Sequence, residues 1–239
     1  MRRGVFVTGT GTGVGKTAVT RGVVRALRRR GVDVAALKPV ESGFAEAGED
    51  GAGSDAAALL RASGRPGSLE DVCAYRLREP VSPHLAAARD GVRIDPARID
   101  ALLRRAEATA DLVVAEGAGG LLVPLNDDLL AADLFARTGY RALIVARNEL
   151  GAIHAALSTV EAARSRGLEV IGVVLNGTPA ADFGNAAAIE RFGRVRILGC
   201  FPTVDADDDD ALADAAEAHV DLEEISRSSR PRRSSPGSR

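Results

Sequence analysis

Residues 9–17 read Gly9-Thr10-Gly11-Thr12-Gly13-Val14-Gly15-Lys16-Thr17, a glycine-rich loop between two apolar elements. The apolar run at residues 5–8 predicts a β-strand before the loop, and apolar residues at helical spacing predict a helix over residues 16–30 after it. Glycines allow consecutive backbone N–H groups to turn toward an anion, and the start of a helix adds partial positive charge. The order strand, loop, helix therefore predicts a phosphate-binding P-loop.

Lysine occurs only twice among the 31 basic residues, at Lys16 and Lys38, and each follows a predicted strand. The lysine ammonium is a compact charge on a flexible stem, whereas the arginine guanidinium is a wide planar fork. Lys16 is therefore predicted to reach the outer phosphates of a nucleotide, and the hydroxyl of Thr17 to ligate Mg²⁺. Lys38 is a second candidate for contact with anionic groups.

Length and composition fit one α/β domain. The chain has 239 residues, 46% of them apolar, and a net charge of −2, so it can bury a sizeable core and presents no strongly basic surface for nucleic acid. No apolar run reaches the roughly 18 residues that a membrane span requires, and no targeting pattern is found, so a cytoplasmic location is predicted. Cys73 and Cys200 lie far apart without a C-x-x-C motif, which predicts buried small apolar side chains rather than a disulfide or zinc site.

Apolar strand-like runs alternate with helical segments along the chain. Continuous Val, Ile and Leu runs joined by helical crossovers predict an α/β class, here a single-domain P-loop NTPase-like fold with a mostly parallel sheet and helices on both faces. The predicted strands are residues 5–8, 32–37, 112–115, 142–146, 170–175 and 196–200. The predicted helices are residues 16–30, 55–62, 96–108, 129–137, 152–166 and 185–192.

Two segments are predicted to lie outside this regular pattern. Residues 43–54 are rich in Gly, Ala and acidic residues and are long enough to form a mobile functional loop. Residues 226–239 carry five arginines, no acid and no apolar residue able to pack, which predicts a disordered basic tail. The folded domain is therefore predicted to span residues 1–225.

Polar residues follow several predicted strands, at the edge where ligands bind in folds of this class. Glu116 comes after the apolar run 111–115 and can hold Mg²⁺, the alternative being a helix-capping or solvated acid. Asp55 is a second candidate, although Ser54 or Asp55 is equally suited to cap the following helix. Asn176 offers the donor and acceptor that an adenine edge requires, but asparagine before glycine is equally typical of a turn.

Six segments, in this order and spacing, carry a family resemblance: GTGTGVGKT, LKPVESG, GSDAAAL, PVSPHLAA, VAEGAGGLLVPL and ELGAIHAAL. Together they resemble the dethiobiotin synthetases over about residues 6–202. The loop is especially specific, because Gly15 follows Gly9 by six positions and gives G-x5-G-K-T rather than G-x4-G-K-T. The resemblance implies an enzyme of biotin biosynthesis that uses ATP and Mg²⁺. It would join CO2 to 7,8-diaminononanoate through a carbamate and a carbamic-phosphoric anhydride, giving dethiobiotin, ADP and phosphate.

The resemblance also implies roles residue by residue. Lys38, Lys16 and Thr12 would be catalytic, and Thr17, Asp55 and Glu116 would hold Mg²⁺. The nucleotide would be bound by Gly13, Val14, Gly15, Lys16, Thr17, Ala18, Asp55, Glu116, Gly117, Ala118, Gly119, Asn176, Gly177, Pro202, Thr203 and Val204. The substrate would contact Ser42, Gly119, Gly151, Ala152 and Ile153, of which the last three come from the neighbouring subunit of a homodimer with shared active sites.

Two positions depart from the family pattern. Gly13 stands where many members carry glutamate, which removes a possible polar contact in the phosphate loop. Gly177 follows Asn176 where aspartate is common, which weakens the implied preference for adenine. His154, near the start of the predicted helix 152–166, is predicted to be a packed or solvated side chain rather than a catalytic one.

Two other classes share this broad architecture. Chromosome-partition and division-site ATPases carry an extra lysine early in a shorter loop, where this chain has Thr10 and Gly11, and its acidic segment 205–224 is unsuited to an anionic membrane. Amide-forming synthetases of corrin biosynthesis usually add a glutamine-hydrolysing domain with a nucleophilic cysteine, and fewer than forty residues follow Cys200. Neither class explains the motifs as well.

Overall fold

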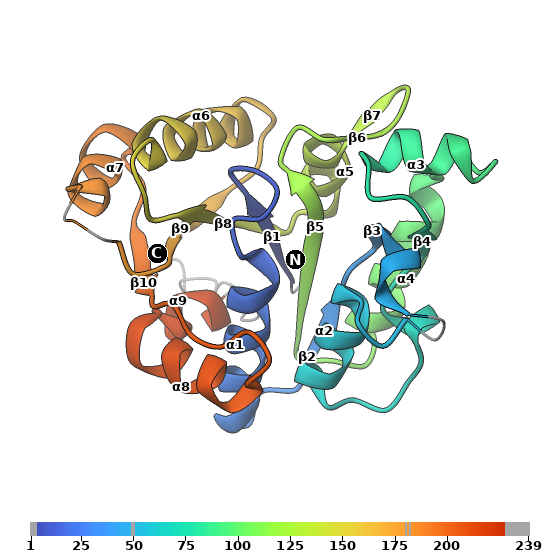
Figure 1. The fold of residues 1–239 in the computed structure, drawn as a ribbon, viewed down its shortest axis with the longest axis horizontal. Coiled ribbons are helices and arrows are strands. Elements are labelled where there is room, and N and C mark those ends of the chain that lie inside the picture. Colours follow the sequence, from blue (N-terminus) through green and yellow to red (C-terminus); the bar gives the residue numbers. More distant parts are fainter. Residues whose placement is uncertain (1–3, 49–50, 180, 182, 228–239) are drawn as a thin grey trace, which may run out of the picture.

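The computed structural model describes residues 4–48, 51–179, 181 and 183–227. At its centre lies a six-stranded sheet in the order β10-β9-β8-β1-β5-β2, in which every neighbouring pair is parallel (Figure 1). The predicted α/β class with a mostly parallel sheet is therefore confirmed. The strands are β1 (Gly4–Gly9), β2 (Val34–Leu37), β5 (Leu112–Gly120), β8 (Arg141–Arg147), β9 (Val170–Asn176) and β10 (Ile197–Phe201).

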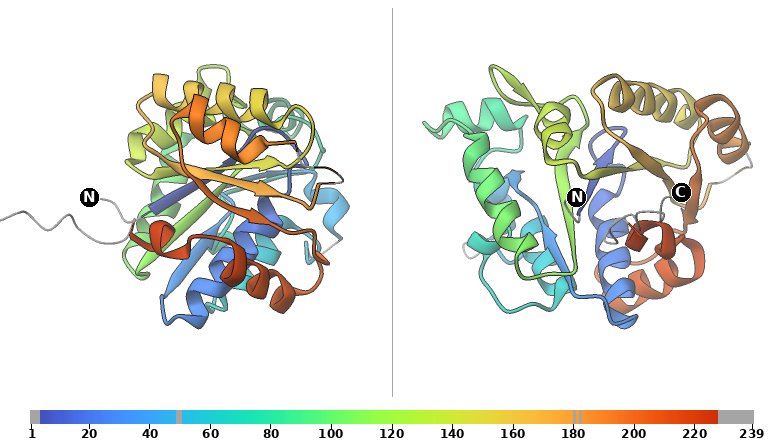
Figure 2. Two further views of the ribbon diagram at one scale, coloured as in Figure 1. Left: turned by 90° about the vertical axis from the view of Figure 1, so that its left-hand side faces the viewer. Right: turned by 180° about the vertical axis from the view of Figure 1, so that it is seen from behind.

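Helices cover both faces of the sheet because successive strand residues point to opposite sides (Figure 2). In β1, Val5 and Val7 join one core cluster, whereas Phe6 joins the other and stacks on Phe135 with ring centroids 3.7 Å apart. The first face carries α1 (Lys16–Arg29), α2 (Asp55–Ser63), α8 (Asp209–His219) and α9 (Leu222–Arg227). The second carries α4 (Pro96–Glu107), α5 (Ala131–Thr138), α6 (Ala152–Ser165) and α7 (Asn185–Gly193).

Short elements surround the main sheet. Strand β3 (Val40–Ser42) pairs in parallel with β4 (Tyr75–Leu77), and β6 (Pro124–Asn126) pairs antiparallel with β7 (Leu129–Leu130). The predicted helix 129–137 therefore begins too early, because residues 129 and 130 belong to β7. The remaining elements are the 3-10 helices η1 (Phe44–Ala47) and η2 (Leu69–Asp71) and the helix α3 (Pro83–Arg89).

Strand β5 is longer than its apolar run. The sequence predicts that the strand ends at residue 115, yet it continues through Glu116 to Gly120, where it pairs with Gly9 of β1. Glycines without a side chain to pack weaken a strand locally, so the sequence pattern points to a loop. Pairing with the strand that leads into the P-loop overrides this preference and places Glu116 within the strand.

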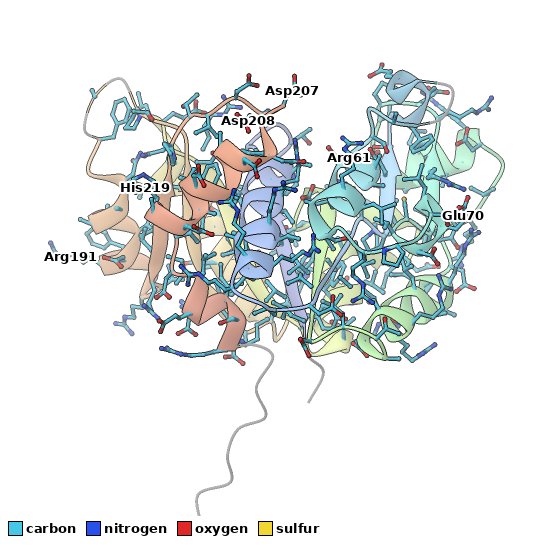
Figure 3. All side chains as sticks on the ribbon, turned by 90° about the horizontal axis from the view of Figure 1, so that it is seen from below. Arg61, Glu70, Arg191, Asp207, Asp208 and His219 are labelled. Carbon is cyan, nitrogen blue, oxygen red and sulfur yellow. The ribbon has the colours of Figure 1, made fainter. Side chains whose placement is uncertain are left out.

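Helix α8 was not predicted, because its acidic sequence resembles a solvated segment. Asp208 caps it by accepting from the backbone N–H groups of Asp210 and Ala211. Its acidic face pairs with α1, where Arg21 contacts Asp209 at 2.6 Å, and Arg25 and Arg29 contact Asp210 at 2.9 Å. Figure 3 labels Asp207 and Asp208 at the start of this acidic segment, near the surface of the molecule.

The two irregular segments are partly described. The predicted loop 43–54 contains η1, and its residues 49–50 lie outside the described residues. Helix α9 ends at Arg227 and so includes the first two residues of the predicted tail, whereas residues 228–239 lie outside the described part. Within the described ranges, no helix is long and apolar enough to cross a membrane.

The two cysteines differ in burial. Cys73 is buried as predicted, and its Sγ donates to the carbonyl oxygen of Tyr75. The prediction was wrong for Cys200, whose side chain is exposed. Cys200 lies in β10, the edge strand of the sheet, where fewer elements are available to cover side chains.

Candidate functional site

The predicted P-loop connects β1 to α1 at the carboxyl end of the sheet. Gly13 and Gly15 have positive φ angles of 73° and 87°, which glycine adopts without strain. A Cβ at Gly15 would lie 2.0 Å from Nδ2 of Asn176, so a larger residue there would displace the Asn176 side chain from its hydrogen bond to Val14. The buried Lys16 donates from Nζ to the carbonyl oxygen of Gly11 at 3.0 Å, inside its own loop.

A second lysine joins the two predicted carboxylate ligands of Mg²⁺. Nζ of Lys38 lies 2.7 Å from Oδ2 of Asp55 and 2.6 Å from Oε1 of Glu116, and Lys38 is only 4% exposed. The hydroxyl of Thr17 donates to the same Oε1 at 2.8 Å. Two residues from strands, Lys38 after β2 and Glu116 in β5, therefore converge with two residues from the starts of α1 and α2, as expected for the ligand edge of this fold.

The charges of this cluster alter one another's ionisation. Burial alone lowers the pKa of Lys38, but the charges of Glu116 and Asp55 outweigh it and hold that pKa above its ordinary value. Burial alone raises the pKa of Asp55, but Lys38 outweighs it and holds that pKa below its ordinary value. Burial, followed by the charge of Lys38, lowers the pKa of Lys16. The cluster thus combines a charged Asp55 carboxylate with a firmly protonated Lys38.

The donor set fits a hard divalent cation. Glu116 is fully buried, and its Oε2 has no hydrogen-bond partner among the described residues. An unpartnered carboxylate oxygen at zero exposure is costly unless another group pairs with it. No group of three or more His, Cys, Asp or Glu that could hold a metal occurs in the described part of the chain. Two carboxylates and a hydroxyl are instead the partial oxygen set typical of Mg²⁺ that also binds substrate phosphates.

Glu41 is a buried acid of this site that the sequence analysis did not single out. Its Oε1 accepts from the backbone N–H of Asp55 at 2.7 Å, and its Oε2 accepts from that of Ala56 at 2.9 Å. Burial raises the pKa of Glu41, although both backbone N–H groups act in the opposite direction. The available signal was an acid three residues after Lys38, in the segment LKPVESG.

A pocket of about 330 Å³ contains these groups. It brings together residues predicted as catalytic, metal-binding and substrate-binding, and it includes Ser42. Its lining residues are Thr12, Gly13, Gly15, Lys16, Thr17, Lys38, Glu41, Ser42, Asp55, Ala118 and Gly119. The fully buried Glu116 lies beneath them, and the backbone of Gly117 lies in β5 next to it.

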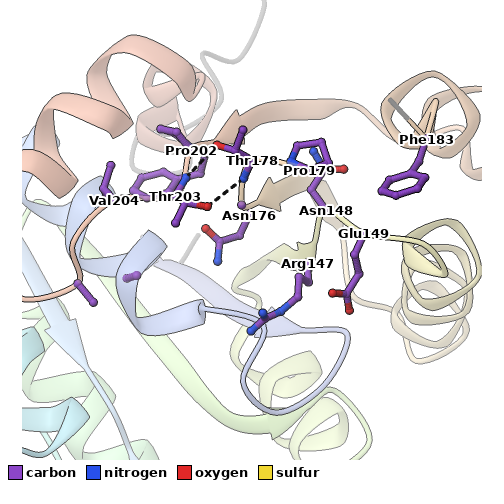
Figure 4. Close-up of a pocket in the computed structure, with 14 residues that line it drawn as sticks. Arg147, Asn148, Glu149, Asn176, Thr178, Pro179, Phe183, Pro202, Thr203 and Val204 are labelled. Atoms are coloured by element: carbon purple, nitrogen blue, oxygen red, sulfur yellow. Dashed lines mark hydrogen bonds between the residues drawn. The ribbon is translucent and has the colours of Figure 1, made fainter. Parts of the chain in front are cut away.

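A second pocket of about 500 Å³ is lined by Ala18, the neighbour in sequence of Thr17 in the first pocket. Figure 4 shows the residues that line this second pocket. The pocket contains the predicted base-binding residues Asn176, Gly177, Pro202, Thr203 and Val204. Nδ2 of Asn176 donates to the carbonyl oxygen of Val14 at 3.0 Å, so this amide fastens the end of β9 to the P-loop. The sequence analysis did not single out Arg147, Asn148, Glu149, Thr178, Pro179, Phe183, Phe201 and Ala206, which complete the wall.

Two loops close over this second pocket through a reciprocal pair of hydrogen bonds. The backbone N–H of Thr178 donates to Oγ1 of Thr203 at 3.1 Å, and the backbone N–H of Thr203 donates to Oγ1 of Thr178 at 3.3 Å (Figure 4). On the opposite side, the guanidinium of Arg147 donates to the carbonyl oxygen of Gly13. The pocket is therefore fixed to the P-loop at one end and bridged between β9 and β10 at the other.

Comparisons with known proteins agree with this geometry. A family model described as an AAA domain matches residues 3–210. The ATP-dependent dethiobiotin synthetase BioD of Anaeromyxobacter dehalogenans (strain 2CP-C) is 44% identical over 84% of this chain and 90% of its own length. That of Rhizorhabdus wittichii is 40% identical over 94% of this chain and 99% of its own length. The chain belongs to the dethiobiotin synthetase family. The resemblance drawn from the motifs is confirmed.

Solved structures share the fold at much lower identity. The structure of a ParA family ATPase from Chlorobium tepidum TLS has a TM-score of 0.53 at 14% identity and covers 96% of this chain and 97% of its own. The MinC:MinD cell division protein complex of Aquifex aeolicus has a TM-score of 0.54 at 15% identity and covers 99% of both chains. These likenesses show the fold alone, whereas the sequence relatives indicate the dethiobiotin synthetase family.

One predicted part of the dethiobiotin synthetase site stays apart from both pockets. Gly151, Ala152 and Ile153 form the start of α6, and none of them lines either pocket of this chain. Leu150 immediately before them is 84% exposed, and His154 is exposed. A single subunit therefore gathers the predicted nucleotide and metal residues, whereas the start of α6 lies outside both pockets, with Gly151 exposed, Ala152 buried and Ile153 packed against the core.

Proposed function

We propose that this chain is an ATP-dependent dethiobiotin synthetase that converts 7,8-diaminononanoate, CO2 and ATP into dethiobiotin, ADP and phosphate in biotin biosynthesis. One observation carries the proposal beyond family membership: Lys16, Thr17, Lys38 and Asp55 line a single pocket directly above the buried Glu116. This pocket adjoins the larger one at the start of α1, so phosphate chemistry and nucleotide binding share one edge of the sheet.

The reaction proceeds in three balanced steps. One substrate amine attacks CO2, forms a carbon–nitrogen bond and loses a proton, giving a carbamate. A carbamate oxygen then attacks the γ-phosphorus of ATP, the bond to ADP breaks, and the carbamic-phosphoric anhydride forms. The second amine attacks the anhydride carbon, phosphate leaves, and the ring closes with loss of a proton. Holding both ends of one molecule in place makes this last step intramolecular, which favours it strongly.

The two lysines supply fixed positive charge. Lys16 contacts the transferring phosphoryl group from the P-loop, and Lys38 neutralises the carbamate and its phosphorylated form. Negative charge on the attacking oxygen and the γ-phosphoryl group changes during transfer, so preplaced cations stabilise the transition state more than the ground state. The side chains of Thr12 and Ser42 line the same pocket and contact the reacting groups and the substrate.

Thr17, Asp55 and Glu116 are the residues that would hold Mg²⁺, for which the unpartnered Oε2 of Glu116 is the supporting observation. Mg²⁺ bound there would neutralise phosphate charge during phosphoryl transfer. The backbone of residues 13–18 and of Gly117, Ala118 and Gly119 would cradle the phosphates.

The larger pocket takes the adenine base. Asn176 and Gly177 lie on one side, and Pro202, Thr203 and Val204 on the other. Nδ2 of Asn176 donates one of its two N–H groups to Val14, which leaves its second N–H and its Oδ1 to meet the base edge.

The substrate carboxylate binds to a neighbouring subunit. We propose a homodimer in which Gly151, Ala152 and Ile153 of one subunit complete the site of the other, since the start of a helix attracts a carboxylate. Their position outside both pockets of their own chain supports this arrangement. A cytoplasmic location, without nucleic acid or membrane as partner, rests on the sequence prediction alone.

ATP turnover tests the activity. Formation of ADP is expected only when diaminononanoate and bicarbonate are both present, with dethiobiotin detected by mass spectrometry in equal amount. Stimulation of ATP hydrolysis by DNA or lipid vesicles in place of the diamine would overturn the proposal.

Mixing two inactive variants tests the shared site. Lys38→Gln removes one half of the site and Ile153→Asp the other, so mixed dimers contain one intact site and activity returns on mixing. Activity that stays absent after subunit exchange has been verified contradicts the shared site.

A further inference from the structure

Glu41 connects strand β3 to the first turn of helix α2. It is 7% exposed, and its two carboxylate oxygens accept from two consecutive backbone N–H groups, those of Asp55 and Ala56. A carboxylate that receives both bonds in this bidentate way is held in one orientation, and it also favours the positive end of the helix. The contact spans fourteen residues of sequence, from a strand to a separate helix.

The remaining backbone donors of this turn are satisfied elsewhere. The N–H of Ala57 donates to Oγ of Ser54 at 3.0 Å, the usual N-cap interaction. The N–H of Ser54 donates to the carbonyl oxygen of Gly51 at 3.0 Å. Without Glu41, the backbone N–H groups of Asp55 and Ala56 would lose their partners, and the first turn of α2 would no longer be held in one orientation.

We propose that Glu41 is a positioning residue that fixes the first turn of α2, so that the carboxylate of Asp55 points at Lys38 and at the Mg²⁺ site. This inference rests on the proposed function, which makes Asp55 a metal ligand. Asp55 is the first residue of α2, so any rotation of that turn displaces its Oδ2 from the position 2.7 Å from Nζ of Lys38. Residues that orient a metal ligand typically change metal affinity about 10- to 100-fold when they are replaced.

The test uses Glu41→Gln and measures Mg²⁺ binding directly. Gln has nearly the same shape, but its amide group places an N–H donor against one of the two backbone donors. Mg²⁺ is titrated into the full-length protein with saturating adenylyl-imidodiphosphate, and its apparent Kd is determined by calorimetry. The expected increase is about tenfold or more. Asp95→Ala is the matched control, since Asp95 caps α4 by accepting from Ala97 at 2.8 Å and lines neither pocket.

Each outcome is decisive. The inference is supported when Glu41→Gln weakens Mg²⁺ binding about tenfold, Asp95→Ala leaves it within about twofold, and both variants lose similar thermal stability. A rise in Kd for Glu41→Gln of less than about tenfold overturns the inference, whereas a parent that binds no Mg²⁺ overturns the metal site of the proposed function instead. In an Asp55→Asn background the effect of Glu41→Gln shrinks below about threefold, because the ligand that it orients is gone. If the effects of Glu41→Gln and Asp55→Asn on the Kd for Mg²⁺ are fully additive, the inference is also overturned.

Discussion

Replacing Lys38 by methionine tests the charge cluster at the centre of the site. Methionine keeps an unbranched side chain of similar length but removes the ammonium that lies 2.6 Å from Glu116 and 2.7 Å from Asp55. Glu116 is fully buried, so its carboxylate loses its only cationic partner in the described structure and keeps only the hydroxyl of Thr17. Asp55, with 41% of its side chain exposed, recovers hydration from solvent.

The expected loss of stability follows from the buried partner. Removing one member of a buried ion pair costs about 3–5 kcal/mol. The contact with Asp55 adds little, because exposed pairs contribute about 0–1 kcal/mol. Since Thr17 still donates to Glu116, the lower limit of about 3 kcal/mol applies to Lys38→Met. At about 2–4 °C per kcal/mol for a chain of this size, Tm falls by about 6–12 °C.

The pH dependence of this loss has a defined sign. The pKa of Lys38 is raised on folding, so its contribution is fully present below its ordinary value of 10.5 and is lost as the pH rises through the folded value. The pKa of Asp55 is lowered, so its contribution is present above its ordinary value of 3.8 and is lost as the pH falls through the folded value. The contribution of these two groups to the stability of the parent is therefore constant between about pH 5 and pH 9.

Circular dichroism melts at pH 5.5, 7.5 and 9 provide the measurement, without nucleotide or Mg²⁺. Arg25→Met is the matched control, because Arg25 pairs with Asp210 at 2.9 Å on the surface, with 33% and 66% of the two side chains exposed. The control is expected to lose less than about 1 kcal/mol. The reasoning is refuted if Lys38→Met lowers Tm by less than about 2 °C, or by no more than Arg25→Met does.

Three further predictions concern chemistry and access. Lys38→Arg keeps the charge but loses most of the single-turnover carboxylation rate, because the planar guanidinium does not fit between two carboxylates at ammonium distance; a rate within about threefold of the parent contradicts this role. Thr203→Val removes the hydrogen bond from the backbone N–H of Thr178 to Oγ1 of Thr203. The KM for ATP is expected to rise about two- to tenfold with kcat nearly unchanged, as for one net hydrogen bond. An unchanged KM in steady-state assays argues against a role of this hydrogen bond in nucleotide binding. Iodoacetamide at pH 8 is expected to label the exposed Cys200 but not Cys73, because burial raises the pKa of Cys73 to about 12 and protects its thiol. Mass spectrometry that shows equal labelling of both cysteines in the folded protein would count against the buried position of Cys73.

The sequence alone determined the P-loop, the parallel α/β class and the family. These follow from contiguous signals: the glycines, Lys16 and Thr17 are neighbours along the chain, and apolar runs specify buried strands through short-range periodicity. Glu116 and Asp55 were also identifiable as acids at strand and helix ends, because parallel strands end at a common edge.

Only the tertiary structure decided how these residues meet. Thr17 and Glu116 are 99 positions apart and Lys38 and Glu116 are 78 apart, so the ammonium between the carboxylates arises from strand order rather than from any local pattern. The same holds for the extension of β5 through its glycines by pairing with β1. The acidic helix α8 likewise depends on the arginines of α1, which lie far away in sequence.

Glu41 shows the difference most clearly. In the sequence it is one acid in a short strand, and nothing within reach of it along the chain requires its carboxylate. In the folded chain it satisfies two donors of a helix that begins fourteen residues later. A local pattern specifies which backbone groups a helix leaves unpaired, but the side chain that pairs with them is set by which elements pack together, and that is a property of the whole fold.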